Sequence, residues 1–73
     1  MKDRIVSNPK ILNGKPIIKG TRISVELILE LLASGMNTGK ILEEYPHLKR
    51  RDILAAINFA AKAIKHEEIM LIG

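Results

Sequence analysis

A set of polar residues between positions 50 and 66 has the types and spacing of a DNA-reading surface. Arg51, Ala55, Asn58, Lys62 and Lys65 recur at three- and four-residue steps, which would place them on one face of a helix. Arginine can contact guanine through two hydrogen bonds, asparagine can do the same to adenine, and lysine can neutralise phosphate. Lys49 and Arg50, directly before this face, would meet backbone phosphates. The chemistry that these residues predict is binding, with Lys49, Arg50, Arg51, Asn58 and Lys62 as the DNA-contacting set.

The same pattern also suits an ordinary surface helix, whose polar face carries lysine and arginine for solubility. From spacing alone we give the two interpretations equal weight. The positive charges, however, concentrate at the proposed reading end, and Arg50 and Arg51 lie near a helix N-terminus, where the helix dipole disfavours cations by up to about 1 kcal/mol. The N-terminal cations could form a second phosphate-contacting surface or guard a strand edge, and we favour the edge guard; they are Lys2, Arg4, Lys10, Lys15, Lys19 and Arg22.

No residue set supports catalysis, a metal or a cofactor. The serines and threonines lack a plausible base, and the chain contains no Gly-rich phosphate loop and no cysteine. His47 and His66 are far apart and have no carboxylate at metal-ligand spacing. Tyr45 and Phe59 are the only aromatic residues, too few to stack single-stranded bases, so duplex DNA is the expected nucleic acid. We therefore expect a protein that is not an enzyme.

The elements that would position this face begin with a β-hairpin within residues 1–23. Short apolar pieces at 5–6, 10–12 and 16–18 are separated by Asn8-Pro9 and Asn13-Gly14, and an Asn-Gly pair is a strong hairpin signal. Pro16 restricts its segment to a sheet edge or to the first position of a strand. Residues 20–22 then form the turn into the helical part.

Three helices are expected within residues 24–66. Ser24 is a good N-cap for a helix over 25–34 with Gly35 just beyond its end, and Asn37 can cap a short second helix that stops at Tyr45-Pro46. A third helix should run over 50–66, and a short turn between the last two helices gives a helix-turn-helix layout. Its apolar residues at helical spacing are Ile53, Leu54, Ile57, Ala60, Ala61 and Ile64, and of these Ile53, Ile57, Ala61 and Ile64 are expected to face inward.

The tail, residues 67–73, either prolongs the third helix or forms a short strand, and we favour the strand. The first helix is apolar over more than one stripe, so part of it should meet another chain. The expected partner or dimer interface consists of Val25, Ile28, Leu29, Leu32, Ile69 and Leu71.

Composition sets the scale of the molecule. Seventy-three residues make a single domain, 1–73, and 47% hydrophobic residues exceed what so small a domain can comfortably bury, which favours a homodimer. The charged residues are unevenly distributed along the chain. Residues 1–22 carry six Lys/Arg against one Asp and residues 49–66 five against one, while residues 23–48 carry four Glu against one Lys. Two basic regions thus flank an acidic one, as in many nucleic-acid binders. The absence of cysteine and of an export signal or membrane span favours the cytoplasm.

A longer motif resembles a known family. The run Asn13-Gly14-Lys15-Pro16-Ile17-Ile18-Lys19-Gly20-Thr21-Arg22-Ile23-Ser24, with the segments 32–36 and 41–48, resembles a bacterial and archaeal family of small proteins known only as a domain of unknown function. The resemblance spans about residues 5–66. It implies a mainly α, homeodomain-like helix-turn-helix fold and the role of an antitoxin that binds a PIN-like ribonuclease toxin and represses its own operon.

Two segments depart from the family pattern. At the start of the second helix, many members of the family are expected to have a sequence similar to Ser-Pro-Glu-Glu, whereas residues 37–40 of this chain are Asn-Thr-Gly-Lys. At the start of the third helix they are expected to have a sequence similar to Thr-Arg-Glu-Asp, whereas residues 49–52 here are Lys-Arg-Arg-Asp. Both changes add positive charge and favour phosphate contact. Two hypotheses follow: an antitoxin-like DNA-binding regulator, or a protein-interaction module and dimeric scaffold that does not bind DNA.

Overall fold

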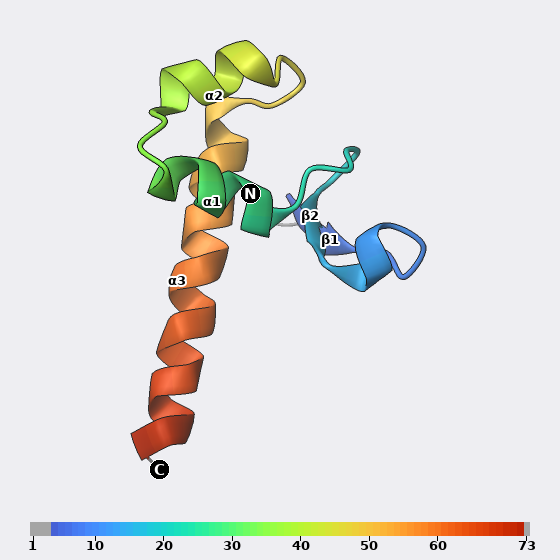
Figure 1. Cartoon of the computed structure of the whole chain (residues 1–73). Helices are drawn as coiled ribbons and strands as arrows, with labels where there is room; N and C mark the ends of the chain where they lie inside the picture. Colours follow the sequence, from blue (N-terminus) through green and yellow to red (C-terminus); the bar gives the residue numbers. More distant parts are fainter. Residues whose placement is uncertain (1–3, 73) are drawn as a thin grey trace.

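Three helices and a two-stranded hairpin make up the part of the chain that the computed structural model describes, residues 4–72, with side chains described for residues 4–66. The elements are β1 (Ile5–Ser7), β2 (Pro16–Ile18), α1 (Val25–Ala33), α2 (Thr38–Glu44) and α3 (Arg50–Ile72). The short helices α1 and α2 lie against the N-terminal half of α3, and the hairpin lies to one side of them (Figure 1). This arrangement confirms the predicted class, mainly α with an N-terminal β-hairpin.

The hairpin is antiparallel, with Ile5 opposite Ile18 and Val6 opposite Ile17. Pro16 is the first residue of β2, as predicted. The expectation of a strand piece at 10–12 is wrong, because two turns follow one another in the connecting loop. Asn8 accepts hydrogen bonds from the N–H groups of Lys10 and Ile11, and a 3-10 turn then covers Leu12–Gly14. Asn13 and Gly14 supply left-handed residues, as expected of such a pair, but inside this longer loop.

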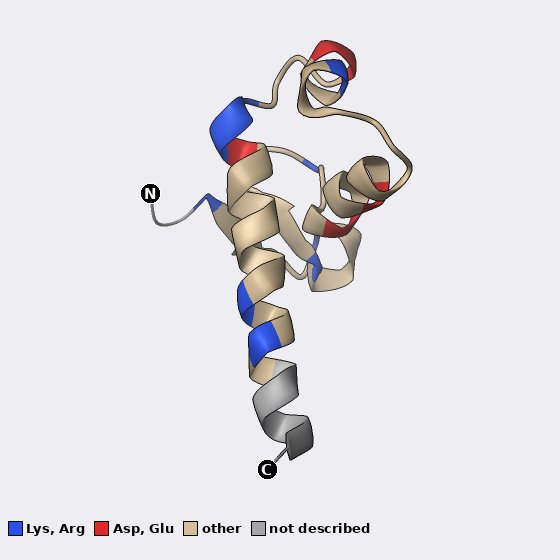
Figure 2. Cartoon of the chain, turned by 90° about the vertical axis from the view of Figure 1, so that its left-hand side faces the viewer, with Lys and Arg blue, Asp and Glu red and all other residues tan. Residues whose placement is uncertain are grey.

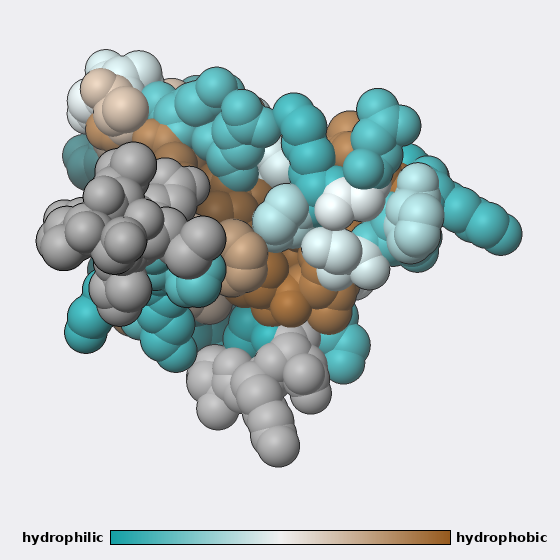
Figure 3. Space-filling view, turned by 90° about the horizontal axis from the view of Figure 1, so that it is seen from below, coloured by the Kyte–Doolittle hydropathy of each residue, from teal (hydrophilic) through white to brown (hydrophobic). Residues whose placement is uncertain are grey.

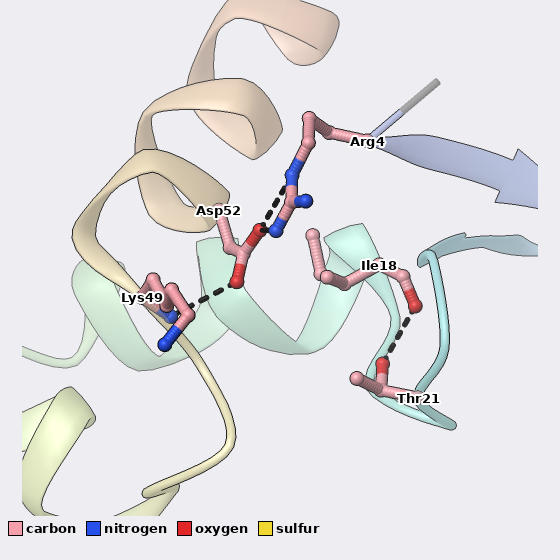
Figure 4. A network of polar contacts seen from close by, with 5 residues as sticks. All are labelled: Arg4, Ile18, Thr21, Lys49 and Asp52. Atoms are coloured by element: carbon pink, nitrogen blue, oxygen red, sulfur yellow. Dashed lines mark hydrogen bonds and ion pairs between the residues drawn. The ribbon is translucent and has the colours of Figure 1, made fainter. Parts of the chain in front are cut away.

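The turn after β2 is held by one side chain. Thr21 donates its hydroxyl to the carbonyl oxygen of Ile18 at 2.8 Å and accepts from the N–H of Ile23 at 3.0 Å. Gly20, with φ of +81°, provides the left-handed position that the turn needs. Figure 4 shows the Thr21–Ile18 bond. The turn directs the chain from the hairpin into α1, as predicted for residues 20–22.

Local capping signals set the bounds of α1 and α2. The Ser24 hydroxyl accepts from the N–H of Leu27 at 2.9 Å, and the Asn37 amide oxygen accepts from the N–H of Lys40 at 2.8 Å. Gly35, at φ of +100°, ends α1, and the N–H groups of Gly35 and Met36 bond back to the carbonyls of Leu32 and Leu31. These are the two bonds of a Schellman motif. Both predicted caps and the predicted Gly35 stop are confirmed.

The core lies where α1, α2, β2 and the first turns of α3 meet. Its members are apolar and almost without exposed surface: Ile18, Val25, Ile28, Ile41, Leu48, Ile53 and Ala56. Among the side chains described, those of residues 4–66, the last core residue along the chain is thus Ala56, less than a third of the way along α3. At about 1.5 Å per residue, α3 extends well beyond the body that it helps to form.

Two expectations for the C-terminal third need correction. The backbone of residues 67–72 continues α3, so the favoured strand is wrong; no glycine or proline interrupts the sequence from Arg50 to Ile72. The expected inward face was also misplaced. Ile53 is buried, but Leu54, Ile57 and Ile64 are 60%, 41% and 61% exposed, and Ala61 is exposed as well. The buried side of α3 passes through Asp52, Ile53 and Ala56 instead.

Candidate nucleic-acid interface

A buried carboxylate fixes the N-terminal end of α3. Asp52 is 2% exposed, and its two oxygens have different partners. Oδ2 accepts from the backbone N–H of Lys49 at 2.9 Å, and Oδ1 accepts from Nε of Arg4 at 3.0 Å and from Nη2 of the same guanidinium. Figure 4 shows the network, which joins the residue before β1 to the start of α3. The carboxylate also interacts favourably with the helix dipole, which offsets part of the cost of Arg50 and Arg51.

The predicted DNA-contacting side chains are exposed at the start and along one side of α3. Lys49, Arg50, Arg51, Asn58 and Lys62 all reach solvent. Among the side chains described for residues 4–66, none of the four cations in this set makes an ion pair. Figure 2 shows the Lys and Arg positions of α3 on the side turned away from the acidic positions of α1 and α2. Their charge is therefore available to an anion.

Three of the five predicted residues line one hollow. Arg51, Asn58 and Lys62 border a concave surface of about 420 Å³, together with Ala55. Lys49 and Arg50 do not line it and lie at the start of α3 instead. The hollow therefore joins two cationic groups and one amide on a single helix face, next to two further exposed cations.

Sequence reasoning missed other residues around the hollow. Arg4 and Ile5, at the start of the hairpin, line it from the side. Leu54 and Phe59 also border it, although the sequence analysis assigned neither of them to the binding face. No sequence signal links Arg4 to α3, because its partner Asp52 is 48 positions away. Placing Asp52 on the buried side of the helix would have rotated the expected inward face. That rotation would have put Leu54 on the exposed side, next to the hollow.

The residues predicted for a partner interface divide into three groups. Val25 and Leu29 line a groove between α1 and α3. Ile28 has no exposed surface and lies inside its own chain, and Leu32 is half-buried against the same core, so neither contributes to the groove. The side chains of Ile69 and Leu71 lie outside the described residues.

The described part of the chain offers neither a metal site nor a membrane-spanning helix. Within residues 4–66, no three His, Asp or Glu side chains come together in a way that could hold a metal ion. None of the helices in the described part of the chain combines the length and the apolar character that crossing a membrane would require.

The chain is similar to known proteins in both sequence and fold. The family model described as "Protein of unknown function (DUF433)" matches residues 5–60. The uncharacterized protein y4eO of Sinorhizobium fredii (strain NBRC 101917 / NGR234) is 34% identical over 56 residues, which are 77% of this chain and 25% of that protein. The chain thus spans about a quarter of this relative's length. The crystal structure of a DUF433 member protein from Anabaena variabilis ATCC 29413 is similar with a TM-score of 0.82 and 22% identity, over 99% of this chain and 71% of that one.

Proposed function

The chain belongs to the DUF433 family of proteins of unknown function, and from this premise we propose that it is a DNA-binding regulator of the antitoxin type. The observation that carries the proposal is the exposed face of α3, where two cations that make no ion pair within residues 4–66 share a hollow with one amide next to the helix start. Arg51 and Asn58 would read base edges, and Lys49, Arg50 and Lys62 would hold phosphates. No catalytic step belongs to this proposal.

The geometry favours duplex DNA over other polyanions. The face belongs to a single straight element, and a helix of ordinary diameter fits the major groove of B-DNA. Asp52 and Arg4 hold the start of this helix against the hairpin, so the cations project from a fixed support. A preorganised support lowers the ordering cost of binding.

The proposed protein partner follows from the resemblance alone. It is a PIN-like ribonuclease toxin, bound in the cytoplasm, with two copies of this chain presenting two α3 helices to symmetric half-sites. The apolar groove between α1 and α3 favours the second candidate function, a protein-interaction module that does not bind DNA. Co-expression and co-purification with the protein encoded by the neighbouring gene would test whether this chain binds a toxin.

Salt-dependent binding separates the two functions. We expect the full chain to bind a fluorescent duplex that carries the DNA preceding its own gene, with an affinity that falls steeply between 50 and about 200 mM salt. The double variant Arg51→Glu with Lys62→Glu should weaken binding about 100-fold at equal salt, because it places carboxylates against phosphates. The measurement is fluorescence anisotropy.

The control applies the same charge change elsewhere. Lys10 and Arg22 are exposed on the hairpin side, so Lys10→Glu with Arg22→Glu alters the net charge equally and should change the affinity by no more than about threefold. Equal losses in both double variants would mean that only net charge matters. A chain that shows no binding at 50 mM salt would support the interaction module instead.

A further inference from the structure

An exposed leucine lies on the polar face of α3. Leu54 lines the same hollow as Arg51 and Asn58, and it keeps 60% of its accessible surface. It follows Arg51 by three residues and precedes Asn58 by four, so the three side chains are neighbours on the helix surface. Leu54 is not a member of the buried core. This leucine is therefore an apolar group placed between the two residues proposed to read bases.

Leu54 belongs to a small apolar area inside the hollow. Ala55 and Phe59 of α3 line the hollow as well, and Ile5 of β1 lines it from the hairpin. Phe59 is 40% exposed. Hydrophobic surface is visible between α3 and the hairpin when the molecule is seen from the C-terminal end of α3 (Figure 3). A ligand of the hollow thus meets apolar groups beside the cations, and a phosphate alone would leave these apolar groups unused.

The charges around the hollow favour an anionic ligand. The charged residues that line it are all basic: Arg4, Arg51 and Lys62. Arg4 is paired with the buried Asp52, so the uncompensated positive charge comes from the other two. None of the carboxylates described within residues 4–66 lines the hollow. A polyanion can therefore bring its own apolar groups against Leu54 without meeting a negative charge.

The groove between α1 and α3 is also apolar, but its charges differ. Glu26 and Glu30 line it, together with one cation, Lys15, which bonds to Glu26 at 2.8 Å. The pKa of Lys15 is raised from its ordinary value because its ammonium group hydrogen-bonds to Glu26 and lies in the field of that carboxylate. Since Lys15 is neutralised by its partner, the charge of Glu30 remains. Of the two apolar surfaces, only the hollow therefore suits DNA.

The major groove of DNA offers one apolar group, the C5-methyl group of thymine. It lies on the same base edges that carry the hydrogen-bonding groups of guanine and adenine. Asn58 follows Arg51 by seven residues, which is about 10 Å along a helix axis and about three base-pair steps of a duplex. On a helix that lies along the groove, Leu54 is therefore placed over a base pair between those that Arg51 and Asn58 would contact.

We propose that Leu54 contacts the C5-methyl group of a thymine that lies between the bases read by Arg51 and Asn58. This inference rests on the proposed function and adds a base preference to it. The preferred half-site carries a guanine and an adenine about three base pairs apart, with a thymine on either strand between them. Burial of the methyl group against Leu54 removes apolar surface of both partners from water.

Replacement of thymine by deoxyuridine tests the contact, because it removes the methyl group and keeps the charge and the base pairing. The probe is the fluorescent duplex that carries the DNA preceding the gene of this chain, with every thymine replaced. At equal salt, the full natural chain should bind the deoxyuridine duplex about fourfold more weakly for each methyl group that it contacts. A duplex with 5-bromodeoxyuridine, whose bromine is similar in size to a methyl group, should restore the affinity. Fluorescence anisotropy measures all three.

Two exposed aliphatic residues of α3 provide matched variants. Leu54 and Ile64 are 60% and 61% exposed, but Ile64 does not line the hollow. Leu54→Ser should bind the thymine and deoxyuridine duplexes with equal affinity, because the methyl group has lost its partner. Ile64→Ser should keep the affinity ratio of the natural chain. Circular dichroism at 222 nm checks that both variants are folded.

The outcomes separate this inference from the proposed function. A natural chain that binds both duplexes equally, with the steep salt dependence of a phosphate-binding protein, would overturn the thymine contact alone. An affinity ratio that persists in Leu54→Ser would assign the methyl contact to another residue and overturn the role of Leu54. No binding of either duplex at about 50 mM salt would overturn both, and the hollow would then belong to an interface with another protein.

Discussion

At the scale of single residues, Asp52 links the start of α3 to the hairpin, a connection that no sequence pattern indicated. Its carboxylate is buried at the start of α3, where it accepts from the backbone of Lys49 and pairs with Arg4 from the hairpin. A buried charge is tolerated only when its partners satisfy it. Asp52 therefore sets both the start of α3 and the position of the hairpin beside it.

Removal of this carboxylate should destabilise the whole fold. We expect Asp52→Ala to lower the free energy of unfolding by about 3 kcal/mol, since it leaves Arg4 without its partner and the N–H of Lys49 without its acceptor. Asp52→Asn keeps an acceptor for Lys49 and should cost clearly less. Urea unfolding followed by circular dichroism at 222 nm measures both. A loss below about 1 kcal/mol in Asp52→Ala would show that the pair is compensated elsewhere.

At the scale of elements, Gly35 after the end of α1 and Gly39 inside α2 have opposite roles. Gly35 ends α1 at φ of +100°, a conformation that L side chains rarely adopt. Gly39 lies inside the first turn of α2, where a Cβ would meet only the Asn37 amide oxygen, at 3.4 Å. Glycine is therefore required at the first position and dispensable at the second.

The same substitution should then have opposite effects at these two positions. Gly35→Ala should lower the free energy of unfolding by about 1 to 2 kcal/mol, because alanine is strained in the left-handed region. Gly39→Ala should raise it by up to about 1 kcal/mol, because alanine favours a helix and restricts the unfolded chain. Thermal unfolding of the two variants under one set of conditions tests this expectation, and a destabilised Gly39→Ala would mean that the Asn37 cap is disturbed.

At the scale of the whole molecule, the hollow and the groove lie on different sides of α3. The DNA-contacting residues Arg51, Asn58 and Lys62 line one hollow, and Ala60, Ala63 and Ile64 line the groove against α1. Phe59 borders both. A duplex on the polar side of α3 would therefore leave the groove against α1 uncovered.

The proposed arrangement of two copies on symmetric half-sites predicts the salt dependence of binding. If each copy places three to four cations on phosphates, the slope of log K against log salt should be about −3 per copy and about −6 for two copies. A duplex shortened to a single half-site should then give roughly half the slope of the full duplex. Anisotropy titrations at several salt concentrations provide the slopes. Identical slopes on the two duplexes would mean that only one copy contacts DNA.

The sequence by itself determined the bounds of α1 and α2, because caps and stops act between residues three or four positions apart. This local information is carried by four residues: Ser24, Gly35, Asn37 and Pro46. The sequence also predicted correctly that Arg51, Asn58 and Lys62 are exposed. Only the tertiary structure decided which side of α3 is buried, because Asp52 can face inward only when Arg4, 48 positions away, is folded against it. It also decided that the tail continues α3 and that the hairpin loop is built from consecutive turns. The periodicity of apolar residues is a property of one segment, whereas the burial of a side chain depends on which other segments of the folded chain pack against it.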